Sequence, residues 1–459
     1  MTEKFLLVGT YVKRGLGLLA QSSTEAYHSL DELERLVETA GGTVVEKTVQ
    51  ALEQVQAATF IGQGKVELLR AKALNKEFNV LVFDDELKPA QLKNLTEKIP
   101  VKILDRTRII LDIFAKRART REGILQVELA QLSYLLPRMT ERYGQFEQQV
   151  GGIGTRGPGE RKLEVEARHV RERTASLRKQ ILQIGVQRQV ARDRRHKVPL
   201  PVITLVGYTN AGKSTLLNTL VSHFGQSQEK VYADDKLFAT LDPTTRRIRL
   251  PRSRWALFTD TVGFIHKLPT HLVAAFRSTL EETLDADILL HLIDVTDAKW
   301  QDHFQTVIEI LHSLDKNANH KNKKSSSFLQ RMMMVYNKTD LLSKKDQENL
   351  RHSHAQLLNA MEKIAGLEKI ELPPQITFGM NVSAKTGTGI NALLETIETR
   401  LSETMLEKVI DIPFTKMRVL PMVYRLGQVQ KSEHKKNFLR VTLHLEKSHW
   451  QQLEKILNA

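Results

Sequence analysis

The stretch that decides the fold runs from residue 202 to residue 222. The apolar run Val202–Val206 leads directly into Gly207-Tyr-Thr-Asn-Ala-Gly-Lys-Ser214, and the helical pattern Thr215–Ser222 follows. A strand, a glycine-rich turn and a helix in this order are the required setting of the G-x-x-x-x-G-K-[ST] phosphate loop. Backbone N–H groups of such a loop turn inward around a phosphate, and the helix N-terminus adds positive potential. The predicted contacts are Gly207, Tyr208, Thr209, Asn210, Ala211, Gly212, Lys213 and Ser214. Lys213 would span the β- and γ-phosphate oxygens, and the Ser214 hydroxyl would ligate Mg²⁺.

Three downstream segments each follow an apolar run that is typical of a strand. Asp260 ends the run Ala256–Thr259, where its carboxylate can hold Mg²⁺ through water and the Gly263 N–H can contact a γ-phosphate. Asp340 can accept hydrogen bonds from the N1–H and 2-amino group of guanine, and the Ala384 N–H could meet guanine O6. Adenine offers neither donor, so the pattern predicts GTP or GDP rather than ATP. The residues predicted to contact nucleotide in these segments are Asp260, Thr261, Val262, Gly263, Asn337, Lys338, Thr339, Asp340, Ser383, Ala384 and Lys385.

Taken together and in this order, the four segments resemble the fingerprint of translation-factor-type P-loop GTPases. We therefore expect an α/β unit with a mostly parallel sheet and flanking helices. Residues 237–246 lie where a switch that senses the γ-phosphate is expected. One threonine of this segment should reach Mg²⁺, and spacing alone leaves Thr240, Thr244 and Thr245 as candidates.

Two positions bear on the rate of hydrolysis. Ras-like enzymes orient the attacking water with a glutamine directly after the Asp-x-x-Gly glycine, and here that position is Phe264. The sequence predicts slow hydrolysis that a partner accelerates, whether or not Phe264 simply packs. Asn210 resembles the asparagine with which some GTPases hold K⁺ beside the phosphates, although a structural hydrogen bond is the other interpretation. His266 is assigned no chemistry.

Charge is concentrated in one part of the chain. The 459 residues include 68 Lys and Arg and 53 Asp and Glu, which gives a net charge of +15. Between Val101 and Val198 there are 22 basic and 11 acidic residues, so +11 of this excess lies there. Such a concentration indicates a polyanionic partner, either nucleic acid or a membrane surface, or else a solvated basic helix. The chain has no cysteine, no apolar run long enough to span a membrane and no signal-peptide pattern at Met1, so we expect a cytoplasmic protein.

Four units are expected along the chain. Residues 1–105 alternate short strands (Phe5–Val8, Thr43–Val45, Val80–Phe83, Val101–Leu104) with helices, which predicts a small parallel α/β sheet. Residues 106–197 predict two long helices joined by a glycine-rich loop, with the first interrupted from Tyr134. Leu163, Val170, Leu177 and Ile184 fall seven apart and predict a coiled-coil seam, with Ala167, Thr174 and Ile181 at complementary positions.

The third and fourth units are residues 202–402, which carry the nucleotide motifs, and residues 405–459, a small α+β domain. In the third unit, Lys316–Ser327 is polar and basic and is predicted to be a disordered loop. In the fourth, Val423–Val429 and Phe438–Leu445 predict a strand pair, and Lys447–Leu457 a closing helix.

Almost the whole chain resembles the HflX family of ribosome-associated GTPases, in the Obg–HflX group. The resemblance rests on Ile61-Gly-Gln-Gly-Lys-Val-Glu67, Asp105-Arg-Thr-Arg108, Gln126-Val-Glu-Leu-Ala130, Gly151–Glu164 and Phe238-Ala-Thr-Leu-Asp242. It implies that Thr240 is the switch threonine that ligates Mg²⁺, and that Lys213, Thr240 and Gly263 serve catalysis. It also places Phe238, Ala239, Thr240, Leu241 and Asp242 at the nucleotide. One departure is Val165-Glu-Ala-Arg168, where the family usually has an Asp-Arg-Arg run.

The resemblance implies a large-subunit partner and a role in splitting stalled ribosomes, notably under heat stress. Arg156, Arg161 and Lys162 on the glycine-rich tip are the candidate contacts to ribosomal RNA. A subunit-assembly GTPase, a membrane-surface switch and an ATP-dependent helicase are the rival interpretations. Gly62-Gln-Gly-Lys65 could be a second nucleotide loop, but it lacks the other glycines and the Ser/Thr, which favours a strand–helix turn. A monomer is expected, with a membrane as the secondary partner that the basic stretch allows.

Overall fold

The computed structural model describes residues 3–12, 22–149, 158–195, 200–225, 237–238, 241–252, 254–269, 272, 286–317, 327–343, 345–346, 350, 357, 361, 379–403, 406–445, 450, 453–454 and 457. Arg156, Ala239 and Thr240 lie outside these ranges, as do residues 318–326 of the predicted disordered loop. The helix that carries Arg161 and Lys162 is described, but their side chains are not.

The N-terminal unit is a four-stranded parallel sheet in the order β2-β1-β3-β4, which confirms the predicted parallel α/β fold. Its elements are β1 (Lys4–Val12), α1 (Ser23–Ala40), β2 (Thr43–Leu52), α2 (Gln63–Leu74), β3 (Val80–Phe83), α3 (Pro89–Lys98) and β4 (Lys102–Asp105). Helix α1 packs on one face of the sheet and α2 and α3 pack on the other. Strand β2 runs seven residues beyond its predicted end at Val45. The prediction looked for runs of apolar residues, whereas an edge strand such as β2 also tolerates polar residues.

Three helices follow: α4 (Arg106–Arg117), α5 (Arg121–Gln149) and α6 (Pro158–Arg195). The predicted interruption of the first long helix at Tyr134 is wrong, since α5 continues through Pro137 to Gln149. The Tyr134 hydroxyl and the Arg138 guanidinium, on either side of the proline, both donate to Asp105 and hold this part of the helix on the sheet. Tertiary contacts thus outweigh the hydrogen bond that a proline removes.

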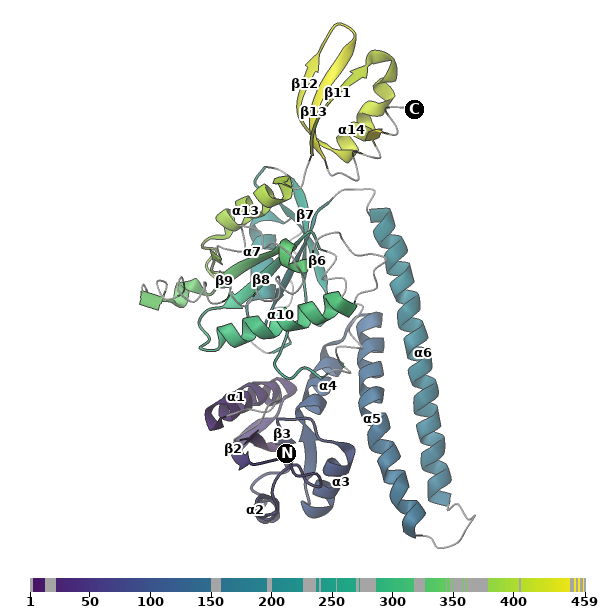
Figure 1. Ribbon diagram of the computed structural model, residues 1–459, viewed down its shortest axis with the longest axis vertical. Coiled ribbons are helices and arrows are strands. Elements are labelled where there is room, and N and C mark those ends of the chain that lie inside the picture. Colours follow the sequence, from purple (N-terminus) through teal and green to yellow (C-terminus); the bar gives the residue numbers. More distant parts are fainter. Residues whose placement is uncertain are drawn as a thin grey trace.

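Helices α5 and α6 form the predicted hairpin (Figure 1). Ala167, Thr174 and Leu177 are buried, and Val170, Ile181 and Ile184 are half-buried, so these six predicted heptad positions form the seam. The side chain of Leu163, the seventh, lies outside the described part of the chain. Arg173 reinforces it by donating to both Glu128 oxygens at 2.7 and 2.8 Å.

The central unit is a six-stranded sheet in the order β10-β9-β8-β5-β7-β6, in which only β6 is antiparallel to its neighbour. Its elements are β5 (Val202–Gly207), α7 (Lys213–Phe224), β6 (Thr244–Arg249), β7 (Trp255–Asp260), β8 (Ile288–Asp294), α10 (Trp300–Asn317), α11 (Phe328–Arg331), β9 (Met332–Asn337), η2 (Thr339–Leu341), β10 (Met380–Asn381) and α13 (Ile390–Glu403). Helix α10 covers one face, and α7 and α13 cover the other. The expectation of a mostly parallel sheet with flanking helices is confirmed.

The C-terminal unit is a three-stranded antiparallel sheet in the order β11-β13-β12. Its elements are β11 (Leu406–Pro413), η4 (Phe414–Val419), α14 (Leu420–Leu426), β12 (Gln428–His434) and β13 (Phe438–Leu445). The strand predicted over Val423–Val429 begins only at Gln428, as β12, which pairs with β13; its first part is wrong, because Val423 and Leu426 lie in α14 and are buried at helical spacing. Of the predicted closing helix, Trp450, Leu453, Glu454 and Leu457 are described and are helical.

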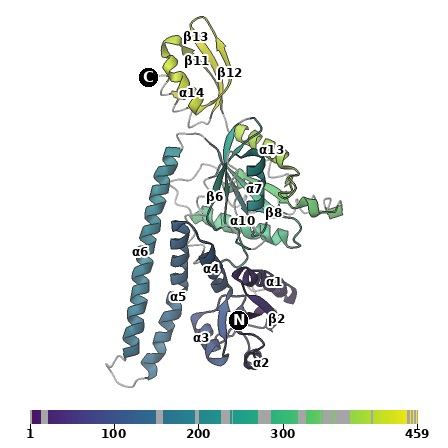
Figure 2. The ribbon, with the colours of Figure 1, turned by 180° about the vertical axis from the view of Figure 1, so that it is seen from behind.

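The molecule is elongated, as the front and back views show (Figures 1 and 2). The C-terminal unit lies at one end, the central unit follows it, and the N-terminal unit and the lower parts of α5 and α6 lie side by side toward the other end. Helix α1 faces α10, and α6 extends beyond α5 alongside the central unit. Among the described residues, no helix is both long enough and apolar enough to cross a bilayer.

Candidate nucleotide-binding site

The loop between β5 and α7 has the backbone that a phosphate loop needs. Gly212 has φ +89° and Gly207 has φ +153°, values that L side chains rarely adopt. A Cβ on Gly207 would lie 2.4 Å from the Leu292 carbonyl oxygen, and one on Gly212 would lie 2.2 Å from Asn337 Nδ2. Asn210 also has a positive φ, of 61°. The motif's glycines are thus required by close packing as well as by chain direction.

Lys213 is folded back over this loop. Its Nζ donates to the carbonyl oxygens of Gly207 at 3.0 Å and Tyr208 at 2.7 Å. The side chain is buried, and burial lowers the pKa of Lys213 to about 8, although nearby Asp260 acts to raise it. A cation held in this way is ready to exchange two carbonyl partners for phosphate oxygens.

The Asp-x-x-Gly segment lies directly beside the loop. Strands β5 and β7 pair in parallel with Leu205 opposite Asp260, and the Ser214 hydroxyl donates to Asp260 Oδ2 at 2.6 Å. A Cβ on Gly263 would lie 3.1 Å from Lys213 Nζ. The structure therefore brings Lys213, Ser214, Asp260 and Gly263 together, as the sequence predicts.

The segments predicted to bind the base are joined to the loop through Asn337. Its Nδ2 donates to the Ala211 carbonyl at 2.8 Å, and its Oδ1 accepts from the Ala384 N–H at 2.9 Å. The predicted donation from Ala384 to guanine O6 would compete with this bond, so it stays a prediction. Lys338 Nζ donates to Asp294 Oδ2 at 2.6 Å, while Asp340 and Lys385 are exposed. Thr339 donates to the Val382 carbonyl, and Ser383 is buried and accepts from the Thr386 N–H.

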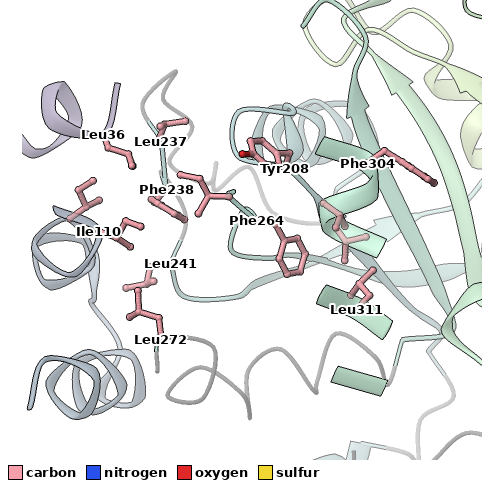
Figure 3. Packing of buried hydrophobic residues seen from close by; sticks show 14 of the residues in the cluster. Leu36, Ile110, Tyr208, Leu237, Phe238, Leu241, Phe264, Leu272, Phe304 and Leu311 are labelled. Carbon is pink, nitrogen blue, oxygen red and sulfur yellow. The ribbon is translucent and has the colours of Figure 1, made fainter. Parts of the chain in front are cut away.

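The switch segment is packed on the N-terminal unit (Figure 3). The Phe238 ring meets Phe114 edge-on with centroids 4.7 Å apart, and Leu237 and Leu241 are buried in the same cluster. Asp242 accepts from the backbone N–H groups of Arg119 and Thr120 at 3.0 and 2.9 Å. The side chains of Phe238, Leu241 and Asp242, predicted to lie at the nucleotide, are therefore occupied by contacts with α4 and the start of α5.

The structure also places Thr244, Thr245 and Phe264, which lie near the switch segment. Thr244 and Thr245 lie in β6, and the Thr245 hydroxyl is 2.9 Å from that of Thr259. The third candidate switch threonine, Thr240, lies outside the described residues. Phe264 is 2% exposed and is part of the apolar cluster, so it packs.

A second contact with the N-terminal unit begins at Tyr208 in the phosphate loop. Its ring stacks on His303 with centroids 3.8 Å apart, and its hydroxyl donates to Glu32 Oε1 and accepts from the His266 N–H at 2.7 Å. Burial raises the pKa of Tyr208 well above its ordinary value, so the hydroxyl keeps the proton it donates. A cavity of about 600 Å³ between α1 and α10 reaches this residue.

Buried charges surround that contact. Arg106, 1% exposed, donates to Asp84 Oδ1 at 3.2 Å and pairs with Glu32. Lys267, just after the Asp-x-x-Gly segment, donates to Asp84 Oδ2 at 2.5 Å and Asp85 Oδ1 at 2.6 Å. Burial raises the pKa of Asp84, but Arg106 and Lys267 outweigh it and hold that pKa below its usual value.

Sequence reasoning missed this network, because its members are far apart along the chain. The available signal was Arg106, a basic residue between a buried strand and an apolar helix, where a charge needs a partner. The Gly62–Lys65 segment, by contrast, is tied to β2: the Gly62 N–H donates to Gln50 Oε1 at 3.2 Å, and Lys65 Nζ donates to the Thr48 hydroxyl. These contacts favour a strand–helix turn.

Comparisons with known proteins agree with this arrangement. Family models described as GTP-binding GTPase N-terminal, GTP-binding GTPase middle region, 50S ribosome-binding GTPase and HflX C-terminal domain match residues 27–115, 117–195, 202–338 and 374–459. GTPase HflX of Caldanaerobacter subterraneus is 42% identical, with 89% of this chain and 85% of that protein covered. GTPase HflX of Escherichia coli K12 is 36% identical, with 88% and 86% covered.

A GTP-binding protein from Sulfolobus solfataricus, solved in complex with GDP, is similar over 86% of this chain and 99% of that one, at 22% identity and a TM-score of 0.43. The fold and the phosphate loop define a P-loop GTPase, an enzyme that hydrolyses GTP. The chain belongs to the HflX family.

Proposed function

We propose that the GTP form of this protein docks on the large ribosomal subunit and separates the subunits, and that hydrolysis releases it. The observation that carries the proposal is the hairpin, which projects away from the central unit as a long pair of helices (Figure 1). Arg168, Arg171, Arg178 and Lys179 are exposed on α6. Exposed cations on a narrow, extended support suit a cavity lined by RNA phosphates, where binding depends on salt and shape.

The residues at the phosphate loop fit a nucleotide with Mg²⁺. Ser214 and Asp260 place two oxygen donors 2.6 Å apart beside Lys213, and oxygen is the ligand type that Mg²⁺ prefers. The metal would be held by Ser214 and Thr240, with Asp260 acting through water, and would neutralise phosphate charge. Asn210 is where K⁺ would bind, and comparing GTP turnover in potassium and sodium salts tests that assignment.

Stimulation by the ribosome belongs to the same proposal. Phe264 offers no hydrogen bond to a water, and the nearby cations Arg106 and Lys267 are engaged with carboxylates of the N-terminal unit. Neither of these cations is placed to stabilise charge that develops on the phosphates. The ribosome would supply the group that accelerates hydrolysis. In this proposal the protein acts in the cytoplasm and as a monomer.

Sucrose-gradient profiles of intact ribosomes test the splitting step. Ribosomes mixed with the protein and a non-hydrolysable GTP analogue should yield free subunits, and those mixed with GDP should not. Binding to the large subunit without release of free subunits would instead identify an assembly factor and contradict the splitting proposal.

A further inference from the structure

The cap at the start of the hairpin is held by Asp242, a residue of the switch segment. Thr120 precedes α5 and accepts the Gly123 N–H at 3.0 Å through its hydroxyl, which is the arrangement of an N-cap. The Asp242 carboxylate accepts that hydroxyl and the backbone N–H groups of Arg119 and Thr120. A carboxylate at a helix N-terminus is also favoured by the helix dipole. The N-cap of α5, Thr120, is therefore held in place by a residue 122 positions away in the sequence.

The packing at this point leaves little room. A Cβ on Gly123 would lie 2.3 Å from Asp242 Oδ1. Phe238, four residues before Asp242, packs against Phe114 near the end of α4, so the segment is held on both sides of the break between α4 and α5. A displacement of the segment must move the start of α5 or release its cap.

The hairpin is in turn fixed to the N-terminal sheet. Asp105 is fully buried and accepts the Tyr134 hydroxyl at 2.9 Å, an Arg138 N–H at 3.1 Å and the Leu87 N–H at 3.2 Å. Together with the α5–α6 seam, these bonds make the sheet and the hairpin one body. Motion imposed at the start of α5 is thus carried to the far tip.

We infer that Asp242 is a positioning residue that couples the bound nucleotide to the orientation of the hairpin. The contact of Asp242 with Thr120 and Gly123 is called the joint below. Resting on the proposed function, the inference is that the GTP state sets the docking geometry of the hairpin through this joint. Thr240, the switch threonine that the family resemblance implies, is only two residues before Asp242. Coupling of this kind is reciprocal, so a ribosome that holds the hairpin would act on the switch segment through the same joint.

Gly123→Ala tests the joint without altering the nucleotide site, because the added methyl displaces the Asp242 carboxylate from the hairpin side. Gly185→Ala is the matched control: it also adds a methyl to a hairpin helix, but nothing lies within 4 Å of that Cβ. The chain has no cysteine, so Lys179→Cys on α6 and Glu395→Cys on α13, both exposed, give specific spin-label sites. Electron–electron distance distributions are recorded with GDP and with a non-hydrolysable GTP analogue, after a fluorescent GDP titration of each protein.

The parent protein and Gly185→Ala should show a distance distribution that shifts between the two nucleotides. Gly123→Ala should bind GDP and hydrolyse GTP without ribosomes as the parent does, yet give one distribution in both states. Asp242→Asn, which keeps a carbonyl oxygen for the two N–H groups, should retain most of the shift that Asp242→Ala loses.

A parent-like shift in Gly123→Ala, or no shift in a parent protein that binds both nucleotides, would overturn the joint and leave the proposed function standing. A parent protein that binds no guanine nucleotide would overturn both.

Discussion

The surroundings of Lys213 lead to a testable prediction about how nucleotide binding depends on pH. In the free protein its ammonium is buried against two carbonyl oxygens, and burial lowers its pKa to about 8. Phosphates placed beside it would favour the protonated form and raise that pKa. Binding of nucleotide should therefore be linked to proton uptake wherever the free lysine is partly deprotonated.

The expected pH dependence follows from the sign of that change. The contribution of Lys213 to GDP affinity should be constant well below pH 8 and should fall above it, by about tenfold per pH unit at most. Calorimetry at pH 8.5 in buffers of different ionisation enthalpy should show uptake of roughly three-quarters of a proton, since a group of pKa about 8 is mostly deprotonated there. Absence of proton uptake would contradict a Lys213 whose pKa is lowered in the free protein and raised by the phosphates.

Substitution of Asp340 tests whether this residue makes the site prefer guanine to adenine nucleotides. Replacing it with Asn removes the charge that would accept two guanine N–H groups and presents an NH₂ to one of them. Loss of about 3 kcal/mol, roughly a hundredfold in affinity for GDP, is expected, with affinity for ADP changed far less. Competition binding with both nucleotides measures this. Asp346→Asn, another exposed carboxylate nearby that is bonded to Ser343, is the control and should have no effect. Unaltered guanine preference in Asp340→Asn would refute the assignment.

At the scale of elements, the sequence predicts best where local chemistry decides. The phosphate loop, the buried strands and the seam of α6 follow from glycine positions, apolar runs and heptad spacing. The prediction was wrong where long-range contacts decide: α5 passes through Pro137 because Tyr134 and Arg138 bind Asp105, and Val423 lies in a helix because α14 packs beneath the sheet. The contacts of Asp242 with Thr120 and of Tyr208 with Glu32 span 122 and 176 residues, which no local pattern encodes.

The buried charges of Arg106, Glu32, Asp84 and Lys267 lead to a prediction about the free energy of unfolding. Arg106→Leu leaves Asp84 and Glu32 without one of their cations in a buried setting, and this should cost about 3 to 5 kcal/mol. Arg108→Leu removes an arginine whose ion pair with Asp112 is half-exposed, and the cost should be below about 1 kcal/mol. The midpoint of urea unfolding measures both. If both variants shifted the urea midpoint by a similar small amount, the buried ion pairs of Arg106 would contribute little to the free energy of unfolding.

For the whole molecule, the central finding is that the segments around the phosphate loop contact the N-terminal unit and the start of the hairpin. Phe238 and Asp242 contact α4 and the start of α5, while Tyr208 and Lys267 contact Glu32 and Asp84 of the N-terminal unit. The phosphate loop and both segments beside it therefore touch the body that carries the basic hairpin. A change at the γ-phosphate has a short physical route to the surface that we propose meets ribosomal RNA.

The most direct test of this account is co-sedimentation of the full chain with separated ribosomal subunits, in a non-hydrolysable GTP analogue and in GDP. The protein should pellet with the large subunit in the analogue, should be largely released in GDP, and should bind less tightly as salt is raised. Equal pelleting in both nucleotides, or pelleting with the small subunit alone, would contradict it.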